Sequence, residues 1–300
     1  MHNLERVEMV ADALAQTDPV SSRFTELVGC EVPVQLAAMG GVGTTELAAA
    51  VVAAGGLGMV PASVGRAAGA CGVNFIVPFR PALDVIEASA RDARVVEFFY
   101  GEPRLDLVEA VHRGGAIAGW QVGSASEAVH AAEVGCDYIV VQGTEAGGHV
   151  YGMQRLDDVM AEVLRTVRLP LVAAGGIATA HRVVELIRSG ADAVRVGTRF
   201  VATSESGAHP RYVERLLEAR AEDTTLTTWF GEGWEDAPHR VLRACIEAGR
   251  ASGWRSTMPP YKDLDREVDD MAMYAGTGVG DITKVEPAAA VVADLVSLLD

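Results

Sequence analysis

Eight short apolar runs, each bounded by turn-forming residues, constrain the fold of this chain most strongly. They lie at residues 33–38, 57–60, 72–77, 94–100, 116–122, 137–142, 169–174 and 193–197. Most of them lack strict alternation of polar and apolar residues, which is typical of parallel strands buried on both faces. Helical patterns lie between them, at residues 44–54, 124–134, 156–167 and 179–189. Strand and helix alternating eight times predict a closed (β/α)8 TIM barrel, an α/β fold.

Local signals place the ends of several helices. Thr44 stands at an expected N-cap, Ser124 to Glu127 have the spacing of a capping box, and Gly190 ends the last of the four patterns. Only residues 61–71 connect the second and third predicted strands, which is close to the shortest parallel crossover. We therefore expect the second helix to be one or two turns long or to be replaced by a loop.

The pattern changes after the eighth predicted strand. Helices are expected at 205–221, 241–248, 263–274 and 287–299, and a Thr-rich segment lies at 223–230. A TIM barrel typically needs about 250 residues, so a chain of 300 residues leaves room for one small additional unit. We expect residues 1–206 and 270–300 to form the barrel. Residues 207–269 are expected to form a small inserted, mostly helical domain near the barrel mouth.

Composition and charge limit the possible partners. Hydrophobic residues make up 49% of the chain and charged residues 22%, so a large core is expected. The net charge of −16 argues against binding to nucleic acid or to an anionic membrane surface. The apolar stretch 47–61 is too short to span a bilayer, and the N-terminus lacks the apolar region of a signal peptide. A cytoplasmic protein is expected.

Motifs for metals and for several nucleotide cofactors are missing from the sequence. The four cysteines form no C-x-x-C pair, and no H-E-x-x-H motif occurs, so no metal site is expected. Neither a P-loop nor a strand-linked G-x-G-x-x-G fingerprint is present. Cys136 begins an apolar run and is expected to be a small core residue.

Glycine-rich turns follow the last two predicted strands, where TIM barrels commonly bind a phosphate. Gly175 and Gly176 follow the seventh strand, and Gly197 and Thr198 follow the eighth. Residues without a Cβ leave backbone N–H groups open to an anion, and a threonine hydroxyl adds a donor. Tight turns alone would also explain these glycines. Their occurrence after both strands favours a phosphate-bearing cofactor or substrate.

The loop after the sixth predicted strand, residues 143–149, has the sequence GTEAGGH. Its histidine, His149, would stand at the carboxyl end of a barrel strand, where active sites form. Such a histidine can act as a general base or as a hydrogen-bond donor near neutral pH. The alternative is an exposed loop histidine, which suits the other histidines better. His149 is therefore the candidate catalytic residue.

Polar residues inside predicted strands suggest further ligand contacts. Asn74 lies within the third strand, and Gln121 ends the fifth. A buried amide needs a hydrogen-bond partner, either a ligand heteroatom or a group on a neighbouring strand. The small residues and Met39 that follow the first strand suit a flat ring. This combination favours a heterocycle such as a flavin.

Several stretches of the chain resemble the nitronate monooxygenase (2-nitropropane dioxygenase) family and the related FMN-dependent enoyl-ACP reductases. They are MGGV at 39–42, AAGGLG at 53–58, GVNF at 72–75, DYIVVQGTEAGGH at 137–149, LVAAGGI at 171–177, ADAVRVGTRFVATSESGAHP at 191–210, APHRVLR at 237–243 and YAG at 274–276. The resemblance extends from about residue 28 to the end of the chain.

The resemblance implies an oxidoreductase that binds FMN in the barrel mouth. The residues that would hold the FMN phosphate are Gly175, Gly176, Gly197 and Thr198. Those that would touch or flank the rest of FMN are Ala37, Met39, Asn74, Gln121, Ala146, Gly147 and Gly148. His149 matches the family's active-site histidine, which would deprotonate a neutral nitroalkane or donate a hydrogen bond to an anionic nitronate. The implied reaction uses O2 to convert an alkyl nitronate or nitroalkane into a carbonyl compound and nitrite.

Three departures from the family pattern leave the substrate open. The chain has Leu-Ala-Ala-Met at 36–39 where Gln-Ala-Pro-Met is usual, Gln121 where Thr or Lys is frequent, and the short 61–71 segment. An NAD(P)H-dependent reductase of an enoyl thioester or of a specialised metabolite is one alternative function. A non-catalytic flavin-binding scaffold is another. The sequence does not distinguish a monomer from a homodimer.

Overall fold

The computed structural model describes residues 21–64 and 71–299. Eight parallel strands form its main sheet, in the order β1-β9-β8-β6-β5-β4-β3-β2. Their bounds are β1 Val34–Leu36, β2 Met59–Pro61, β3 Gly72–Ile76, β4 Val95–Phe99, β5 Ile117–Val122, β6 Tyr138–Gln142, β8 Leu171–Ala174 and β9 Ala193–Val196. Leu57 closes the sheet, because its N–H donates to Val34 O and its carbonyl accepts from Leu36 N, each at 2.9 Å. The predicted TIM barrel is confirmed.

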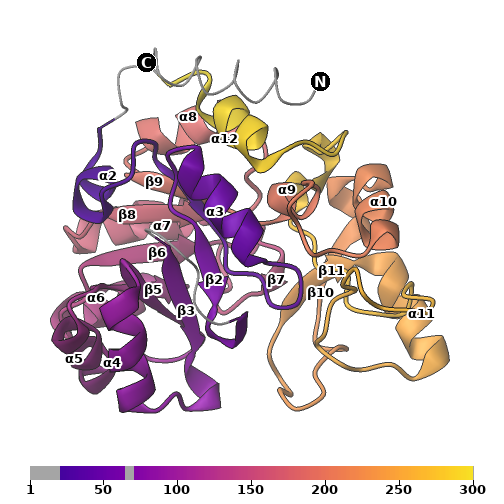
Figure 1. The fold of residues 1–300 in the computed structure, drawn as a ribbon, viewed down its shortest axis with the longest axis horizontal. Helices are drawn as coiled ribbons and strands as arrows, with labels where there is room; N and C mark the ends of the chain where they lie inside the picture. Colours follow the sequence, from indigo (N-terminus) through magenta and orange to yellow (C-terminus); the bar gives the residue numbers. More distant parts are fainter. Residues whose placement is uncertain (1–20, 65–70, 300) are drawn as a thin grey trace.

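Helices cover the outside of the barrel (Figure 1). They are α3 Thr45–Ala53, α4 Leu83–Asp92, α5 Leu105–Gly114, α6 Ala125–Glu133, α7 Leu156–Thr166, α8 Ala180–Arg188 and α12 Ala288–Val296. The last of these completes the ring by packing against α3 and α8. As expected, the side chains of Thr44 and Ser124 cap α3 and α6 by accepting hydrogen bonds from backbone N–H groups of the first turn.

Helix α2 (Arg23–Val28) and the hydrophobic side chains inside the barrel close the end at which the strands have their amino ends. The helix lies across this end, and Phe24 is fully buried against Tyr138, with ring centroids 5.4 Å apart. Phe24 belongs to an inner hydrophobic cluster with Leu57, Met59 and residues of four other strands. A ligand is therefore expected at the opposite end, where the strands have their carboxyl ends.

The connection between β2 and β3 begins as the 3-10 turn η1 (Ala62–Val64). Residues 65–70, which complete this connection, and the N-terminal residues 1–20 lie outside the described range. The expectations for these two segments therefore stay predictions. Among the described residues, no helix is long and apolar enough to cross a membrane.

The elements that follow β9 lie beside the barrel (Figure 1). They are α9 Thr198–Val201, α10 Pro210–Glu218, η3 Ala221–Asp223, β10 Thr224–Thr227, β11 His239–Leu242, α11 Arg243–Ser252 and η4 Thr277–Asp281. Strand β11 pairs antiparallel with β10 on one side and on the other with β7 (Gly148–His149), which belongs to the loop after β6. This small sheet, which no sequence pattern indicated, joins the 143–149 loop to a much later part of the chain.

The prediction of a helix at 263–274 is wrong, since this segment contains no helix. Residues 271–273 are buried in succession, whereas an amphipathic surface helix would leave one face in water. The segment instead runs antiparallel to β11, with Leu242 N donating to Met273 O at 2.9 Å. Acidic composition had suggested a helix, but pairing with a distant strand determines the conformation.

Two further helices differ in extent from the predictions. The helix expected at 205–221 is the shorter α10, which starts at Pro210 because residues before it bond elsewhere; His209 N, for example, donates to Pro260 O at 3.1 Å. The helix expected at 241–248 is shifted to α11, because the residues immediately before Arg243 form β11.

Candidate active site

A cavity of about 580 Å³ lies at the carboxyl ends of the barrel strands. This volume is typical of small-molecule sites, which range over about 300–1,000 Å³. All of the candidate site residues from the sequence line it: Ala37, Met39, Asn74, Gln121, Ala146, Gly147, Gly148, His149, Gly175, Gly176, Gly197 and Thr198. The structure thus brings these residues together around one space.

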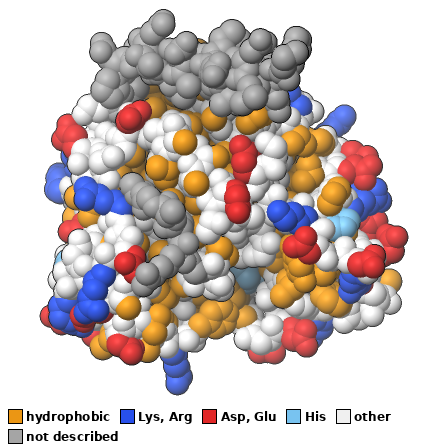
Figure 2. Space-filling model, viewed as in Figure 1, with side chains coloured by type: hydrophobic (Ala, Val, Ile, Leu, Met, Phe, Trp, Pro, Cys, Tyr) orange, Lys and Arg blue, Asp and Glu red, His pale blue; other side chains and the backbone are white. Residues whose placement is uncertain are grey.

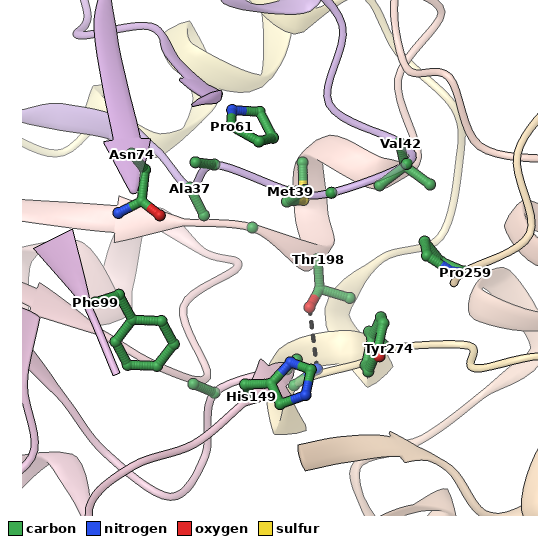
Figure 3. Close-up of a pocket in the computed structure, with 18 of the residues that line it drawn as sticks. Ala37, Met39, Val42, Pro61, Asn74, Phe99, His149, Thr198, Pro259 and Tyr274 are labelled. Atoms are coloured by element: carbon green, nitrogen blue, oxygen red, sulfur yellow. Dashed lines mark hydrogen bonds between the residues drawn. The ribbon is translucent and has the colours of Figure 1, made fainter. Parts of the chain in front are cut away.

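Backbone with little side chain forms one wall of the cavity. Gly175 and Gly176 have positive φ angles of 127° and 67°. A Cβ on Gly176 would lie only 2.8 Å from Thr277 Oγ1. Thr198 Oγ1 accepts a hydrogen bond from Gly276 N at 3.0 Å (Figure 3). This wall therefore offers backbone groups and one hydroxyl to a ligand, with no bulky side chain in front of them.

The turn after β1 packs closely against this wall. A Cβ on Gly197 would meet Ala37 Cβ at 3.3 Å and Met39 Sδ at 3.8 Å. Figure 3 shows Ala37 and Met39 on one side of the cavity, with His149 and Tyr274 across from them. A bound ligand would therefore lie between the β1 turn and His149.

Strand β7 fixes the backbone of His149. In its pairing with β11, His149 lies opposite His239 and Gly148 lies opposite Arg240. Gln142 Nε2 also donates to the His149 carbonyl at 3.0 Å. Arg240 Nε donates to a second carbonyl in the same loop, that of Thr144, at 2.9 Å. The candidate catalytic residue is thus held by a rigid pair of strands, although it was predicted to lie on a loop.

The imidazole of His149 is surrounded by other rings. Trp234 stacks on it, with centroids 4.1 Å apart and planes inclined by 23°. His239, Tyr274 and Tyr100 follow at centroid distances of 5.2, 5.8 and 6.1 Å. Burial among these rings, with a smaller effect of His239, lowers the pKa of His149 to about 3. The imidazole is therefore neutral at physiological pH.

One nitrogen of this imidazole lacks a hydrogen-bond partner among the described residues. Nε2 of His149 is buried and makes no hydrogen bond within the described part of the chain. A buried polar atom is normally hydrogen-bonded, so this unpaired nitrogen is exceptional, although the surrounding protein shields it from the cavity.

Asn74 and Gln121 bond to side chains of other barrel strands. Asn74 Nδ2 donates to Glu97 at 3.2 Å, and Arg195 donates to Gln121 Oε1 at 2.6 Å. Glu97 and Arg195 form a buried ion pair with each other. Asn74 therefore bonds to the neighbouring strand β4, as one of the two expectations had it, whereas Gln121 bonds to β9, which does not pair with β5. Both side chains also line the cavity, so contact with a ligand is compatible with these bonds.

Gln35 and Tyr138 complete this polar network inside the barrel. Tyr138 OH donates to Glu97 at 2.6 Å. Gln35 accepts from Arg195 at 3.0 Å and donates to Glu97 at 3.1 Å. Buried charges are tolerated in proteins when they are paired and hydrogen-bonded, as they are here.

Sequence reasoning missed four residues in or against the cavity wall: Arg195, Trp234, His239 and Tyr274. Arg195 had a detectable signal, because a charged residue inside an apolar strand is unusual. The other three come from the chain after β9, and the pairing of β11 with β7 and with the 271–275 segment brings them to His149. No local pattern indicates such distant pairings.

The charge around the cavity differs from that of the whole chain. Of the described residues that line it, Arg195 is the one charged residue, although the chain has a net charge of −16. On the face seen in Figure 2, hydrophobic side chains lie between acidic and basic ones that are spread over the surface. An anionic ligand in the cavity would therefore meet no adjacent carboxylate.

Comparison with known proteins identifies the family. Residues 66–297 match the family model described as nitronate monooxygenase. The chain belongs to the nitronate monooxygenase family. It is therefore an oxidoreductase, and the resemblance found in the sequence motifs is confirmed.

Similar proteins carry more than one name. The (3aS,4S,5R,7aS)-5-hydroxy-7a-methyl-1-oxo-octahydro-1H-indene-4-carboxyl-CoA dehydrogenase of Mycobacterium tuberculosis is 32% identical over 250 residues, covering 78% of this chain and 69% of the relative. The nitronate monooxygenase of Pseudomonas aeruginosa is 30% identical, covering 74% of this chain and 81% of the relative. The solved structure of FabK from Thermotoga maritima has a TM-score of 0.81 at 28% identity, covering 93% of this chain and 96% of that chain.

Proposed function

We propose that this member of the nitronate monooxygenase family binds FMN in the cavity and oxidises anionic nitronates with O2. The observation that carries the proposal is the neutral imidazole of His149 beside a cavity that no described carboxylate lines. Such a cavity suits ligands that bring their own negative charge, as both FMN and a nitronate do. When bound, FMN supplies the electron acceptor for the substrate and the centre that reacts with O2.

The glycine wall fits the phosphate of FMN. Gly175, Gly176, Gly197 and Thr198 present backbone groups and a hydroxyl there, and a Cβ on Gly176 would already be too close to Thr277. With no lysine among the described lining residues, backbone N–H groups would hold the phosphate.

The remaining lining residues fit a flat heterocycle. Asn74 uses its Nδ2 and Gln121 its Oε1 within the barrel, which leaves one amide oxygen and one amide NH2 for ligand heteroatoms. Ala37 and Met39 would cover one face of the rings, and Ala146, Gly147 and Gly148 would flank them. The bonds to Arg195 and Glu97 hold both amides in a fixed orientation.

The low pKa of His149 distinguishes between its two candidate roles. An imidazole with a pKa of about 3 is a weak base, so removing a proton from a neutral nitroalkane is the less suitable role. A neutral imidazole can still donate a hydrogen bond. We therefore assign a neutral N–H of the His149 imidazole the role of binding and orienting a nitronate oxygen.

A second candidate function is supported by one similar protein. The Mycobacterium tuberculosis relative is named as a dehydrogenase of a carboxyl-CoA compound. In a reaction of that kind, or in NAD(P)H-dependent reduction of an enoyl thioester, the same N–H of His149 would donate to a carbonyl oxygen of the substrate.

We also propose that residues 207–269 form a small inserted domain that supplies Trp234 and His239 to the site. A separate hydrophobic cluster that contains Tyr212, Phe230 and Cys245 supports this division. Residues of the barrel end, such as Val42, share the cluster, so the insertion would pack firmly against the barrel.

Anaerobic flavin reduction tests the proposed function. Purified protein with bound FMN is mixed separately with ethylnitronate, NADH and NADPH, and the flavin absorbance is followed. We expect ethylnitronate to bleach the flavin and O2 to restore the colour with release of nitrite. Bleaching by NADH or NADPH but not by ethylnitronate would replace this function with the reductase. No bleaching by any of the three would favour a non-catalytic flavin protein.

A further inference from the structure

A row of aromatic rings leads from the cavity mouth to His149. Phe79 contacts Trp234 edge-on, with centroids 5.3 Å apart and planes at 60°. Trp234 in turn contacts Tyr100 at 4.5 Å and stacks on His149. Phe79, Trp234 and His149 all line the cavity. Any substrate bound at His149 would therefore have these rings beside it.

Phe79 is unusually exposed for a phenylalanine. Its relative exposure is 63%, and it ends the short 3-10 turn η2 (Val77–Phe79), which carries it to the cavity mouth. A large apolar side chain at the edge of a binding cavity, in contact with a second ring, is typical of a ligand surface.

Backbone with positive φ occurs at or close to three rings of this row. Among the described residues, the non-glycine residues with positive φ are Arg80, Tyr100 and Asp236, at 50°, 65° and 62°. Arg80 directly follows Phe79, Tyr100 is itself part of the row, and Asp236 lies two residues after Trp234. Such conformations are unfavourable for residues with a Cβ and tend to cluster at functional sites. The strain therefore indicates that the positions of these rings serve a ligand.

A second apolar wall contributes to the same cavity. Met258, which is 48% exposed, and Pro259 both line it. Tyr274 OH donates to Thr257 O at 2.7 Å and so anchors the segment that carries them. A methionine can adapt its flexible side chain to ligands of different outline. Among the described residues Arg195 is the one charged residue that lines the cavity, and it is engaged in the ion pair inside the barrel, so the described part of the mouth is uncharged and mostly apolar.

We propose that Phe79 and Trp234 form a subsite for an aromatic ring of the substrate, carried one or two carbons from the carbon that reacts beside His149. The preferred substrates are then aryl-substituted nitronates rather than short alkyl ones. Rings that meet edge-on at 4.5–5.3 Å, as these do, leave faces and edges that a further aromatic ring can contact in the same favourable geometry. The choice of nitronate as the reacting group rests on the proposed function, whereas the ring subsite does not.

Two matched nitronates test the preference. Ethylnitronate and the nitronate of 2-phenylnitroethane share the reacting group and differ by one phenyl ring. We expect kcat/KM for the phenyl compound to be at least about tenfold higher, which corresponds to about 1.4 kcal/mol. The cyclohexyl analogue, which has similar bulk without aromaticity, should lie between them. A ratio near one for phenyl against ethyl would overturn the proposal.

Substitutions of the rings test whether they cause the preference for the phenyl substrate. Phe79→Ala and Trp234→Phe should each lower the ratio of phenyl to ethyl kcat/KM several-fold, and Phe79→Tyr should retain it. Leu105→Ala is the matched control, because Leu105 is also an exposed apolar residue, at 55%, but lies at the start of α5 and does not line the cavity. A wild-type ratio in both Phe79→Ala and Trp234→Phe would place the preference elsewhere.

Binding without turnover separates the subsite from the reaction. 3-Phenylpropanoate and propanoate are unreactive carboxylates of matching shape, and the flavin spectrum of the holoprotein reports their binding. We expect 3-phenylpropanoate to bind at least about tenfold more tightly, and Phe79→Ala to remove most of the difference. If this discrimination occurs but no nitronate is oxidised, the proposed reaction fails and the subsite stands. If the two carboxylates bind equally, the subsite fails whatever the reaction is.

Discussion

His149 and His239 lie opposite each other in the pairing of β7 with β11, with ring centroids 5.2 Å apart. Nδ1 of His239 lies 2.9 Å from the carbonyl of Ala237, so this nitrogen carries the proton and Nε2 is left with a lone pair. Burial lowers the pKa of both histidines. Two neutral imidazoles therefore stand side by side, and several predictions depend on that neutrality.

The first prediction concerns the pH dependence of catalysis. The groups around His149 do not titrate near neutrality, since the pKa of His239 is lowered, that of Tyr100 is raised to about 12, and that of Tyr274 is also raised. We expect kcat/KM for preformed ethylnitronate to be flat from about pH 5.5 to 9. A change in kcat/KM with a midpoint near pH 7 in the wild type that is absent in His149→Gln would show that His149 titrates near neutrality and would contradict the prediction.

The second prediction concerns His239 itself. Its Coulombic effect is the smaller of the two causes that lower the pKa of His149, and burial is the larger. His239→Phe should therefore raise the pKa of His149 while leaving it below its ordinary value of 6.5. Titration of the His149 ring by NMR measures this directly. An unchanged His149 pKa in His239→Phe would show that the two rings do not interact.

The third prediction links the pKa of His149 to stability. Because folding lowers this pKa from 6.5 to about 3, the unfolded chain binds the proton more readily below pH 6.5. Stability from this group is therefore complete above pH 6.5 and decreases as the pH falls toward 3. At pH 5 the loss amounts to about 2 kcal/mol. Urea unfolding with saturating FMN measures the free energy of unfolding at pH 7 and at pH 5. The decrease between these two pH values should be smaller in His149→Gln than in the wild type, by about this amount. Equal decreases in the two proteins would argue against the prediction.

The barrel and the general position of the site could be predicted from the sequence because both depend on local signals. The apolar runs and the caps at Thr44 and Ser124 are properties of short segments. In a parallel barrel the carboxyl ends of all strands meet at one end, so the turns at Gly175 and Gly197 and the loop with His149 had to come together there.

The surroundings of His149 could not be predicted, because distant parts of the chain form them. Trp234 and His239 reach the imidazole through the pairing of β7 with β11, across about 90 residues of sequence. The wrong helix at 263–274 has the same origin, since the chain there follows β11. The hydrogen-bond partners of Asn74 and Gln121 are Glu97 and Arg195. These two residues are buried together only because the barrel closes.

The fourth prediction tests the polar network inside the barrel. Removing one charge of the Glu97–Arg195 pair leaves the other buried without its partner, so Glu97→Gln and Arg195→Met should each destabilise the protein by about 3–5 kcal/mol. The loss of unfolding free energy in the double variant should be smaller than the sum of the losses in the two single variants, by about 2 kcal/mol or more. Urea unfolding of the four proteins measures this coupling. Additive losses would show that the two side chains act independently.

The fifth prediction concerns the proposed phosphate wall. Gly176→Ala introduces a Cβ at positive φ and 2.8 Å from Thr277 Oγ1, on the wall of the cavity. Gly115→Ala is the matched control, because Gly115 also has positive φ, at 88°, but caps α5 away from the cavity with open space around it. Both variants should lose about 1–2 kcal/mol of stability from backbone strain. Titration of the apoproteins with FMN should show at least about tenfold weaker binding in Gly176→Ala and wild-type binding in Gly115→Ala. Equal FMN affinity in the two variants would place the phosphate elsewhere.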